Sequence, residues 1–345
     1  TIISQETIKP SSPTPHNLKT HHLSILDQFS PNINMFHVFF YKNYNRNDTE
    51  FLKQSLSKSL IHYYPFAGRL PSRASSYIDC NDEGIVFFET SNDKKFDDVI
   101  LSIEKGKFVC RSFVFSNKKL KELEKKVVDM GTTPSNPTRV ELVTSLVFKC
   151  VVHAITLNTG CVKPSTLLHT VNMRNRIIKN CNEMPAGNIM TVVAANMAGS
   201  SEIKLNEVVG ELRKAKMEVE GLKDIKEVFN HYQEIILNLG DVETRSQNEV
   251  SDVVNAKVWW KVRKEDRSRQ FGCVYVIFFP RHDDQIDERS SSLCRSSIYN
   301  VDFGWGKPKK VIVRNLDTDK NGFILLDTPY GDGHLRKGCR ASCLW

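Results

Sequence analysis

The sequence predicts an α/β protein, and three observations lead to this fold class. Short runs rich in β-branched and aromatic residues alternate along the chain with segments whose apolar residues recur at the helical period. No internal repeat interrupts this alternation, which favours packed layers of helices and strands. The 345 residues are 40% hydrophobic and exceed the usual domain size of about 100 to 200 residues, so we expect two domains.

The first predicted elements are two strands with a helix between them. Residues 33–41 and 85–90 carry the aromatic and β-branched runs that strands prefer. A polar start at residues 47–49 opens a helix that ends before Pro65, since proline cannot continue a helix. The apolar face of this helix holds Leu52, Leu56, Leu60 and Tyr63.

The later elements continue the alternation. Thr138 and Glu141 have the spacing of a capping box, in which each side chain accepts a hydrogen bond from an otherwise unpaired backbone N–H. The helix that follows, and a second helix over residues 225–239, carry apolar stripes that we interpret as packing surfaces. Four more strands are expected, at residues 165–172, 188–196, 311–316 and 322–327.

The formal net charge of +8 raises the question of a nucleic-acid partner. The densest lysine stretch, residues 118–126, is interleaved with Glu122 and Glu124 on a predicted helix, which is typical of a solvated face. No basic patch with stacking aromatic residues stands out, so we expect no nucleic-acid binding. A modest positive charge also suits a small polyanionic ligand.

Cysteine usage and hydropathy predict a reduced, cytoplasmic protein. The nine cysteines are an odd number at irregular spacing, so they do not form a disulfide framework. We find no secretory leader and no apolar run approaching the roughly 18 residues of a membrane span, and therefore expect no membrane partner. Cys150 with His153, and Cys339 with Cys343, lack a second pair at suitable spacing, so we expect no metal.

Several common catalytic motifs are absent from the sequence. It has no P-loop, no Gly-x-Gly-x-x-Gly after a strand, no Gly-x-Ser-x-Gly and no His-Glu-x-x-His. Phosphate-cradling and simple hydrolase functions are therefore disfavoured.

Two short segments combine residue types in a way that an ordinary helix, strand or loop does not require. The first places two glycines around a tryptophan, a combination typical of a tight loop with aromatic anchors: Asp302, Phe303, Gly304, Trp305 and Gly306. The second, residues 172–176, ends a predicted strand with Arg174 and Arg176, whose planar guanidiniums suit carboxylate or phosphate. By pattern alone, the first segment is explained as a structural loop and the second as a pair of surface arginines.

Together these segments resemble the signatures of one family. Residues 302–306 are similar to the DFGWG motif of the plant BAHD acyl-CoA-dependent acyltransferases, and residues 172–176 to that family's Asn-x-Arg-x-Arg segment, in the same order. The alkaloid-acylating branch is the most similar. Further resemblance extends over most of the chain, at residues 8–15, 23–28, 64–70, 79–81, 187–188, 326–328 and 331–333.

The resemblance implies a two-domain, chloramphenicol-acetyltransferase-like fold, each domain a mixed sheet with flanking helices. We expect an incomplete N-terminal domain over residues 1–106 and a C-terminal domain with the DFGWG loop over residues 107–345. The implied enzyme is a monomer without a bound cofactor. It transfers an acyl group from acyl-CoA, as co-substrate, to a hydroxyl or amine of a small plant metabolite.

The resemblance also implies residue roles. The DFGWG loop would be mainly architectural and lie near coenzyme A, and we expect contacts to coenzyme A from Ser291, Ser292, Arg295 and Lys307. In the family, a histidine in a His-x-x-x-Asp motif is the general base, and the aspartate of that motif pairs with an arginine.

The sequence departs from the family at that motif. None of its ten histidines is followed by aspartate four positions later, so no catalytic residue is assigned. The segments that flank the motif in the family are here only about twenty residues apart, and roughly a hundred residues, the size of a domain, are missing around Lys105. Arg174 or Arg176 would then lack its aspartate partner. Residues 256–289 also match nothing expected of the family.

Two function classes follow from the departure. The first is an acyltransferase by descent whose activity is impaired in this chain. The second is a catalytically dead remnant or mis-spliced product, which could still bind coenzyme A or a partner. We expect His153, in a helix, and His169, in a strand, to have packing roles rather than to replace the missing base, because a base must reach the substrate.

Overall fold

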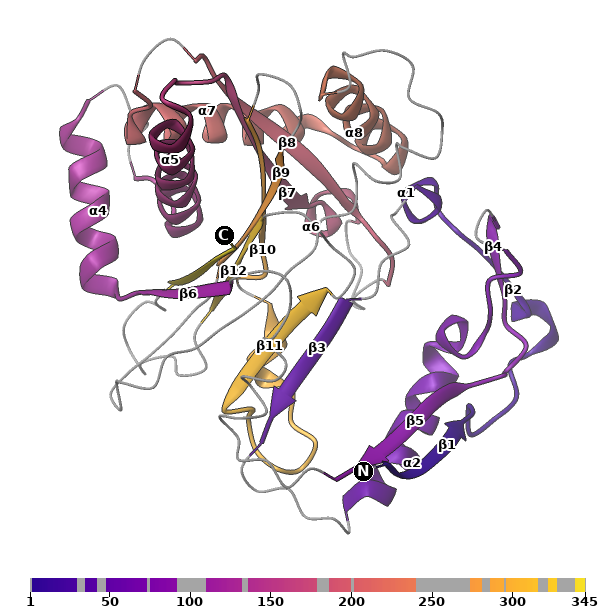
Figure 1. Cartoon of the computed structure of the whole chain (residues 1–345). Helices are drawn as coiled ribbons and strands as arrows, with labels where there is room; N and C mark the ends of the chain where they lie inside the picture. Colours follow the sequence, from indigo (N-terminus) through magenta and orange to yellow (C-terminus); the bar gives the residue numbers. More distant parts are fainter. Residues whose placement is uncertain are drawn as a thin grey trace.

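A seven-stranded mixed sheet organises the later two thirds of the chain (Figure 1). The order is β6-β13-β12-β9-β10-β7-β8, and β10 is parallel to both β7 and β12 whereas the other pairs are antiparallel. The strands are β6 (Cys110–Phe115), β7 (Ser165–Asn172), β8 (Met190–Met197), β9 (Val274–Pro280), β10 (Ile286–Ser292), β12 (Gly322–Asp327) and β13 (Cys339–Leu344).

The computed structural model describes most of the chain. The described residues are 2–29, 35–41, 48–72, 75–91, 110–131, 136–178, 186–199, 202–239, 274–280, 286–294, 296–315, 322–327 and 339–344. The short helices among them are α1 (Ile25–Gln28), α6 (Arg174–Ile177), η1 (His16–Leu18), η3 (Tyr64–Ala67), η4 (Val219–Gly221) and η5 (Ser297–Asn300).

Helices cover both faces of this sheet. On one face α5 (Arg139–Thr159) and α7 (Leu205–Glu218) share the main core with Leu167 and Val193 of the sheet, and α4 (Asn117–Asp129) packs against α5. On the other face α8 (Ile225–Leu239) packs on Leu168 through Ile236. Figure 1 shows α5 and α8 on opposite sides of the sheet. Because adjacent residues of β7 point to opposite faces and both faces are covered, its first five residues are all buried.

The longest helix begins where the capping box predicts. The Thr138 N–H donates to Glu141 Oε2 at 2.9 Å, and the Glu141 N–H donates to Thr138 Oγ1 at 3.2 Å. By length and hydropathy α5 could cross a membrane, so the expectation that no segment reaches that length was wrong. Half of its most apolar window is buried inside the protein, with Phe148 and Val151 in the main core, as in the core helix of a globular fold.

The N-terminal part has a different construction. Among the described residues its strands form only two-stranded antiparallel sheets: β1 (Ile2–Ile8) with β5 (Ile85–Thr90), β2 (Thr20–His22) with β4 (Tyr77–Asp79), and β3 (Met35–Phe40) with β11 (Lys310–Asn315). The β3–β11 pair joins the two ends of the sequence. Helix α2 (Thr49–His62) contacts β1. The predicted domain boundary at residues 106 and 107 lies outside the described residues and stays a prediction.

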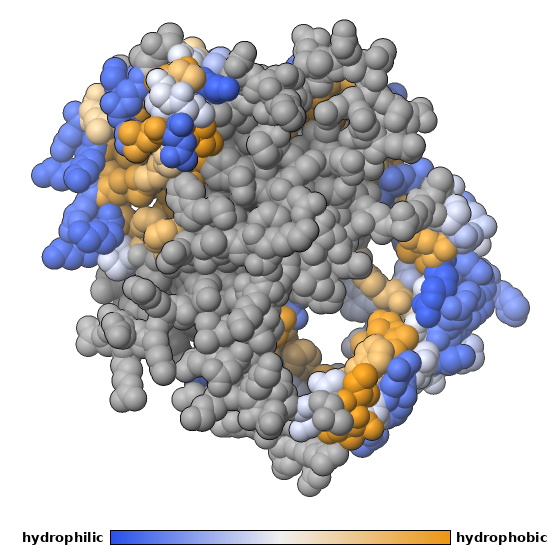
Figure 2. Space-filling model, viewed as in Figure 1, coloured by the Kyte–Doolittle hydropathy of each residue, from blue (hydrophilic) through white to orange (hydrophobic). Residues whose placement is uncertain are grey.

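The two faces of the β1–β5 sheet are covered to different extents. On the α2 side, the Lys53 ammonium lies 5.7 Å from the centre of the Phe87 ring. On the other side Val86 is 45% exposed and Phe88 is 53% exposed. We call Val86 and Phe88, with their exposed β1 partners Thr7 and Gln5, the open face. Figure 2 shows hydrophobic side chains exposed on the N-terminal part.

The predicted elements agree closely with those observed. The strands expected at 85–90, 165–172 and 322–327 are found with those bounds. The strand expected from residue 188 begins at Met190, because the backbone N–H of Asn188 is bound instead by the Asp27 carboxylate, at 2.7 Å. Part of the segment that did not match the family forms β9, which lies in the sheet between β10 and β12. Residues 33, 34 and 316 lie outside the described residues.

The difference in construction predicts unequal stability along the chain. Two-stranded sheets are marginally stable alone, whereas β7 and β8 are buried between helices. We expect the backbone amides of β1 and β5 to exchange with deuterium well before those of β7 and β8, as measured by hydrogen-exchange mass spectrometry at pH 7. Equal protection of the two pairs would contradict this account of the fold.

Candidate functional site

The DFGWG loop is held in a tight turn by one carboxylate. Asp302 Oδ1 accepts hydrogen bonds from the backbone N–H of Gly304 at 2.8 Å and of Gly306 at 3.0 Å. Gly304 has φ of 91° and Gly306 has φ of 78°, in the left-handed region where a side chain would be strained. Aspartate and both glycines are therefore required by the turn itself. The role predicted for this loop beside coenzyme A stays a prediction.

The same loop contacts the N-terminal part of the chain. The Trp305 indole N–H donates to Asp48 Oδ2 at 2.7 Å, at the start of α2. The Tyr41 hydroxyl donates to the Val301 carbonyl at 2.9 Å, and its ring lies edge-on to both Phe303 and Trp305. The sequence pattern marks the loop but not its partners Asp48 and Tyr41, because each lies more than 250 residues away in sequence from its partner.

We expect the Trp305–Asp48 hydrogen bond to contribute measurably to stability. A bond to a charged acceptor is worth about 1.5 to 3 kcal/mol, and partial exposure places this one at the low end. A double-mutant cycle of Trp305→Phe and Asp48→Ala, followed by urea unfolding, should give a coupling energy of about 1.5 kcal/mol. Asp129→Ala, at the end of α4, replaces Asp48→Ala in a matched control cycle that should show no coupling. If the changes in unfolding free energy from Trp305→Phe and Asp48→Ala simply add, the two side chains do not stabilise each other.

The two motif arginines have different surroundings. The Arg174 guanidinium donates to the Gly187 carbonyl, and its backbone N–H donates to Asn172 Oδ1 at 3.0 Å. Arg174 therefore holds the loop that Asp27 also binds. One terminal nitrogen of Arg176 lies 3.6 Å from Glu220, whereas the other, Nη1, is buried and has no hydrogen-bond partner among the described residues. Arg176 is thus the arginine with a spare donor.

The residues predicted to contact coenzyme A lie along one connection. Ser291 and Ser292 end β10, half-buried, and Ser292 Oγ accepts from the Cys294 N–H at 3.2 Å. Lys307 is exposed just after the DFGWG loop, before β11. Arg295 lies outside the described residues. The assignment of these four residues to coenzyme A stays a prediction.

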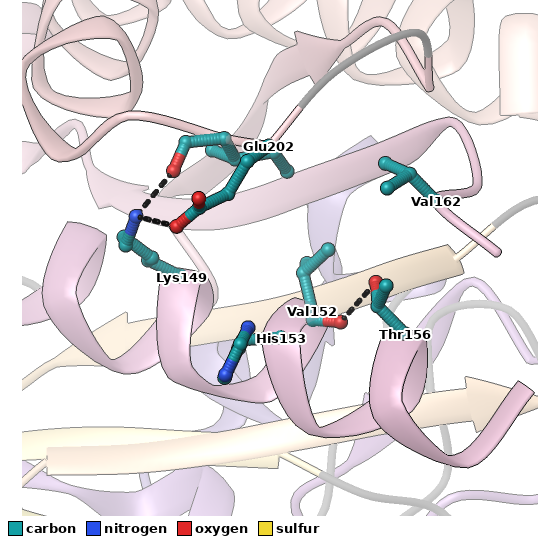
Figure 3. Close-up of a pocket in the computed structure, with 7 residues that line it drawn as sticks. Lys149, Val152, His153, Thr156, Val162 and Glu202 are labelled. Carbon is teal, nitrogen blue, oxygen red and sulfur yellow. Dashed lines mark hydrogen bonds and ion pairs between the residues drawn. The ribbon is translucent and has the colours of Figure 1, made fainter. Parts of the chain in front are cut away.

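Two histidines that could replace a missing base occupy very different places. His153 is exposed on α5 beside a small pocket, shown in Figure 3, with Glu202 and Lys149. Glu202 is already bound by Lys149 at 2.9 Å. His169 is buried in β7, where its Nδ1 lies 2.7 Å from Ser290 Oγ. Burial, reinforced by the Lys216 charge, lowers the pKa of His169 to about 3, so the ring is neutral.

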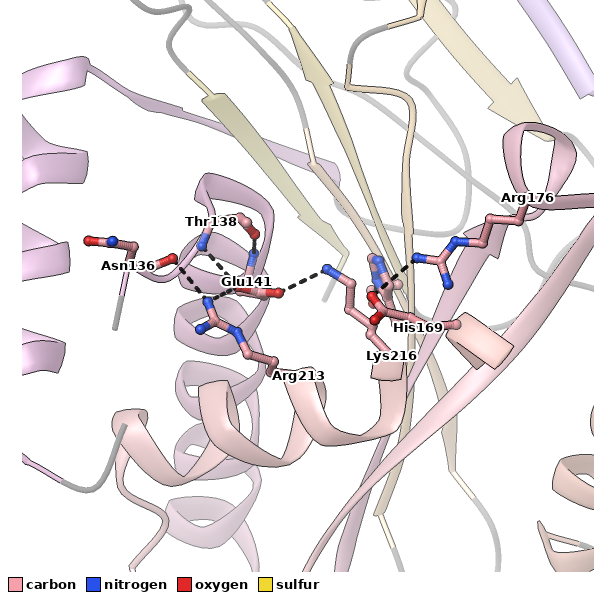
Figure 4. A network of polar contacts seen from close by, with 9 residues as sticks. Asn136, Thr138, Glu141, His169, Arg176, Arg213 and Lys216 are labelled. Carbon is pink, nitrogen blue, oxygen red and sulfur yellow. Dashed lines mark hydrogen bonds and ion pairs between the residues drawn. The ribbon is translucent and has the colours of Figure 1, made fainter. Parts of the chain in front are cut away.

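A buried carboxylate lies close to His169 and organises the polar groups around it (Figure 4). Glu141 accepts from the Arg213 guanidinium at 2.7 Å and from the Lys216 ammonium at 3.0 Å, in addition to the Thr138 N–H. Burial alone would raise the pKa of the Glu141 carboxyl, but these hydrogen bonds and the Lys216 charge lower it to about 2. The capping box predicted only the contact with the Thr138 N–H. Arg213 and Lys216 come from α7, so no local pattern marks them as partners of Glu141.

Replacing this carboxylate should destabilise the protein. At neutral pH we expect Glu141→Gln to lower the free energy of unfolding by about 3 kcal/mol. The reason is that folding lowers the pKa of the Glu141 carboxyl from 4.5 to about 2, and each pKa unit corresponds to about 1.4 kcal/mol. Because the folded pKa is the lower one, this stability is present above pH 4.5 and is lost as the pH falls toward 2. Urea unfolding from pH 7 to pH 3 should show the difference between parent and variant shrinking.

Glu122→Gln is the matched control for this prediction. Glu122 pairs with Lys119 on the exposed face of α4, so its loss should change stability by less than about 1 kcal/mol. Equal effects of the two substitutions would contradict a buried role for Glu141.

Comparison with known proteins identifies the family. The sequence model of the Transferase family matches residues 1–109 and 101–254 of this chain. The chain belongs to the Transferase (BAHD) family. BAHD enzymes are acyltransferases that use acyl-CoA as co-substrate, so the predicted family, enzyme class and co-substrate are confirmed.

Two curated relatives and one solved structure support this assignment. Diaboline synthase from Strychnos is 29% identical, over 96% of this BAHD chain and 86% of its own length. A 17,18-epoxy-17-hydroxycur-19-ene N-malonyltransferase from Strychnos nux-vomica is 28% identical, over 96% of this chain and 84% of its own length. The crystal structure of vinorine synthase matches with a TM-score of 0.70 and 20% identity, covering 99% of this chain and 94% of that one. The predicted fold class is thereby confirmed.

The alignment with diaboline synthase is longer than this BAHD chain. The diaboline synthase match extends over 432 positions, whereas 96% of 345 residues is about 330, so about 100 positions have no counterpart here. The two parts of the family match meet at residues 101–109, between β5 and β6.

Proposed function

We propose that this chain descends from enzymes that transfer an acyl group from acyl-CoA to a hydroxyl or amine of a plant specialised metabolite, and that it no longer catalyses the transfer. The observation that carries the proposal is the absence of any His-x-x-x-Asp in the 345 residues. An acceptor must lose its proton as it attacks the thioester, and a positioned base contributes typically about 10²- to 10⁴-fold to the rate.

The positions of three histidines support this proposal. A base must lie within hydrogen-bond reach of the acceptor. His169 is sealed in the core and its imidazole is bound to Ser290, whereas His153 lies on the outer surface of α5. His231 is half-buried, and its Nδ1 lies 3.3 Å from Thr191 Oγ1 between α8 and β8. We therefore assign these three histidines to packing or to the protein surface, and none of them to the role of the base.

Loss of an internal segment accounts for the missing motif. The roughly 100 positions of diaboline synthase without a counterpart, and the junction of the two family matches after β5, support a deletion between β5 and β6. The spare donor of Arg176 is what the loss of an aspartate partner would leave behind. We further propose that the chain is a cytoplasmic monomer, and that the region of Ser291, Ser292, Arg295 and Lys307 contacts coenzyme A.

The proposal predicts no acyl transfer by the purified chain. With acetyl-CoA or malonyl-CoA and a panel of alcohol and amine acceptors, release of free coenzyme A should equal the rate in buffer alone. Diaboline synthase prepared in parallel is the positive control for the assay. Turnover well above the buffer rate, and lost in His153→Gln or His231→Gln, would overturn the proposal and identify the base. Binding of acyl-CoA without turnover, measured by calorimetry, would support it.

A further inference from the structure

A cavity of about 290 Å³ lies at the β8 side of the large sheet and is lined by residues of α7 and α8. Both helices contact β8, and Figure 1 shows the strand between them. The cavity is beside the beginning of β7, whereas the two motif arginines follow the end of that strand. The charged and polar side chains that line it include Thr166, Asn196, Glu211, Lys214, Glu218 and Glu234.

Negative charge dominates this lining. Glu211, Glu218 and Glu234 contribute three carboxylates, against the single ammonium of Lys214. Lys214 lies 3.9 Å from Glu211, and within the described part of the chain no lysine or arginine forms an ion pair with Glu218 or Glu234. The whole chain carries a formal net charge of +8, so the cavity is opposite in sign to the rest of the molecule. A bound cation would relieve the mutual repulsion of these carboxylates.

The spacing of the carboxylates favours an extended cation over a metal ion. Glu211 and Glu218 are seven residues apart on α7, which separates them by about 10 Å along the helix axis at a rise of about 1.5 Å per residue. The described residues contain no group of three or more histidine, cysteine, aspartate or glutamate side chains that could hold a metal ion. A metal ion needs several ligands that converge on one point, whereas a linear diamine carries its two charges at separate positions.

The rest of the lining suits the chain of such a diamine. The Thr166 hydroxyl is buried and donates to Asn196 Oδ1 at 2.8 Å, so this pair is held in place at the sheet. Between the charged groups the cavity is lined by the apolar side chains of Ala194, Ala215 and Ile235. An apolar chain with a positive charge at each end is therefore complementary to this surface.

We propose that this cavity binds a linear organic diamine in its doubly protonated form. One ammonium group pairs with Glu211, the other pairs with Glu218 and Glu234, and the methylene chain packs on Ala215 and Ile235. This binding site does not depend on the proposed loss of acyl transfer, because none of its residues belongs to the family motifs.

His231 provides a reporter for this site that is independent of calorimetry. Its ring lies between α8 and β8, with Nδ1 3.3 Å from Thr191 Oγ1. Burial lowers the pKa of His231, and the negative charges of Glu218 and Glu234 act in the opposite direction. An ammonium group bound at these two carboxylates offsets their charge, so we expect the pKa of His231 to fall further when the diamine binds.

The test uses the whole chain, with 1,8-diaminooctane as the probe and the uncharged 1,8-octanediol as the control of equal length. At pH 7 and low salt we expect calorimetry to show 1:1 binding of the diamine, about tenfold tighter than that of the diol and weaker at high salt. Glu218→Gln and Glu234→Gln should each weaken binding about threefold, the scale of one exposed ion pair. Lys214→Gln should strengthen it, because it removes the competing ammonium. An NMR titration of His231 with and without the diamine measures the expected fall in its pKa.

Glu122→Gln is the matched control variant. It changes the net charge of the chain by the same amount as Glu218→Gln, but on the exposed face of α4, and should leave the affinity unchanged. Protection of the β7 and β8 amides from hydrogen exchange in every variant verifies that the large sheet is folded.

Four outcomes would overturn the inference. The first two are equal binding of the diol and the diamine, and binding that the double substitution of Glu218 and Glu234 by glutamine does not weaken. The third is displacement of the diamine by an equal concentration of Mg²⁺, which would assign the carboxylates to a metal ion. The fourth is a pKa of His231 that stays the same when the diamine binds.

Discussion

The pairing of β3 with β11 is the constraint on which the arrangement of the whole chain depends. It joins residues 35–40 to residues 310–315 and places the DFGWG loop, which immediately precedes β11, against the N-terminal part. The Trp305–Asp48 hydrogen bond and the Tyr41 contacts then attach the loop to the beginning of α2 and to the end of β3. A family motif defined by five consecutive residues therefore acts structurally through partners at the other end of the sequence.

The two parts of the molecule differ in what stabilises them. The large sheet buries apolar side chains on both faces, and the Glu141 carboxylate with its two cationic partners joins α5 to α7 beside that core. The N-terminal part relies on two-stranded sheets, one of which leaves Val86 and Phe88 exposed.

Local sequence patterns predicted most of the elements but few of the contacts that unite them. The strands at 85–90 and 165–172 and the capping box at Thr138 could be predicted because their signals lie within a few residues. The partners of Trp305 and Glu141 could not, because nothing local marks Asp48 or Arg213 as their counterparts. The position of β9 inside the sheet was also unexpected, since its sequence matched no family segment.

We propose that this BAHD scaffold lacks acyl transfer because it lacks the segment that carries the base. The most direct measurement is the rate of acyl-CoA turnover by a chimera in which the diaboline synthase segment is inserted at Lys105, compared with the unmodified chain. We expect turnover in the chimera, none in the unmodified chain, and loss again when the histidine of the inserted motif is replaced by alanine. Equal turnover by the chimera and the unmodified chain would contradict it.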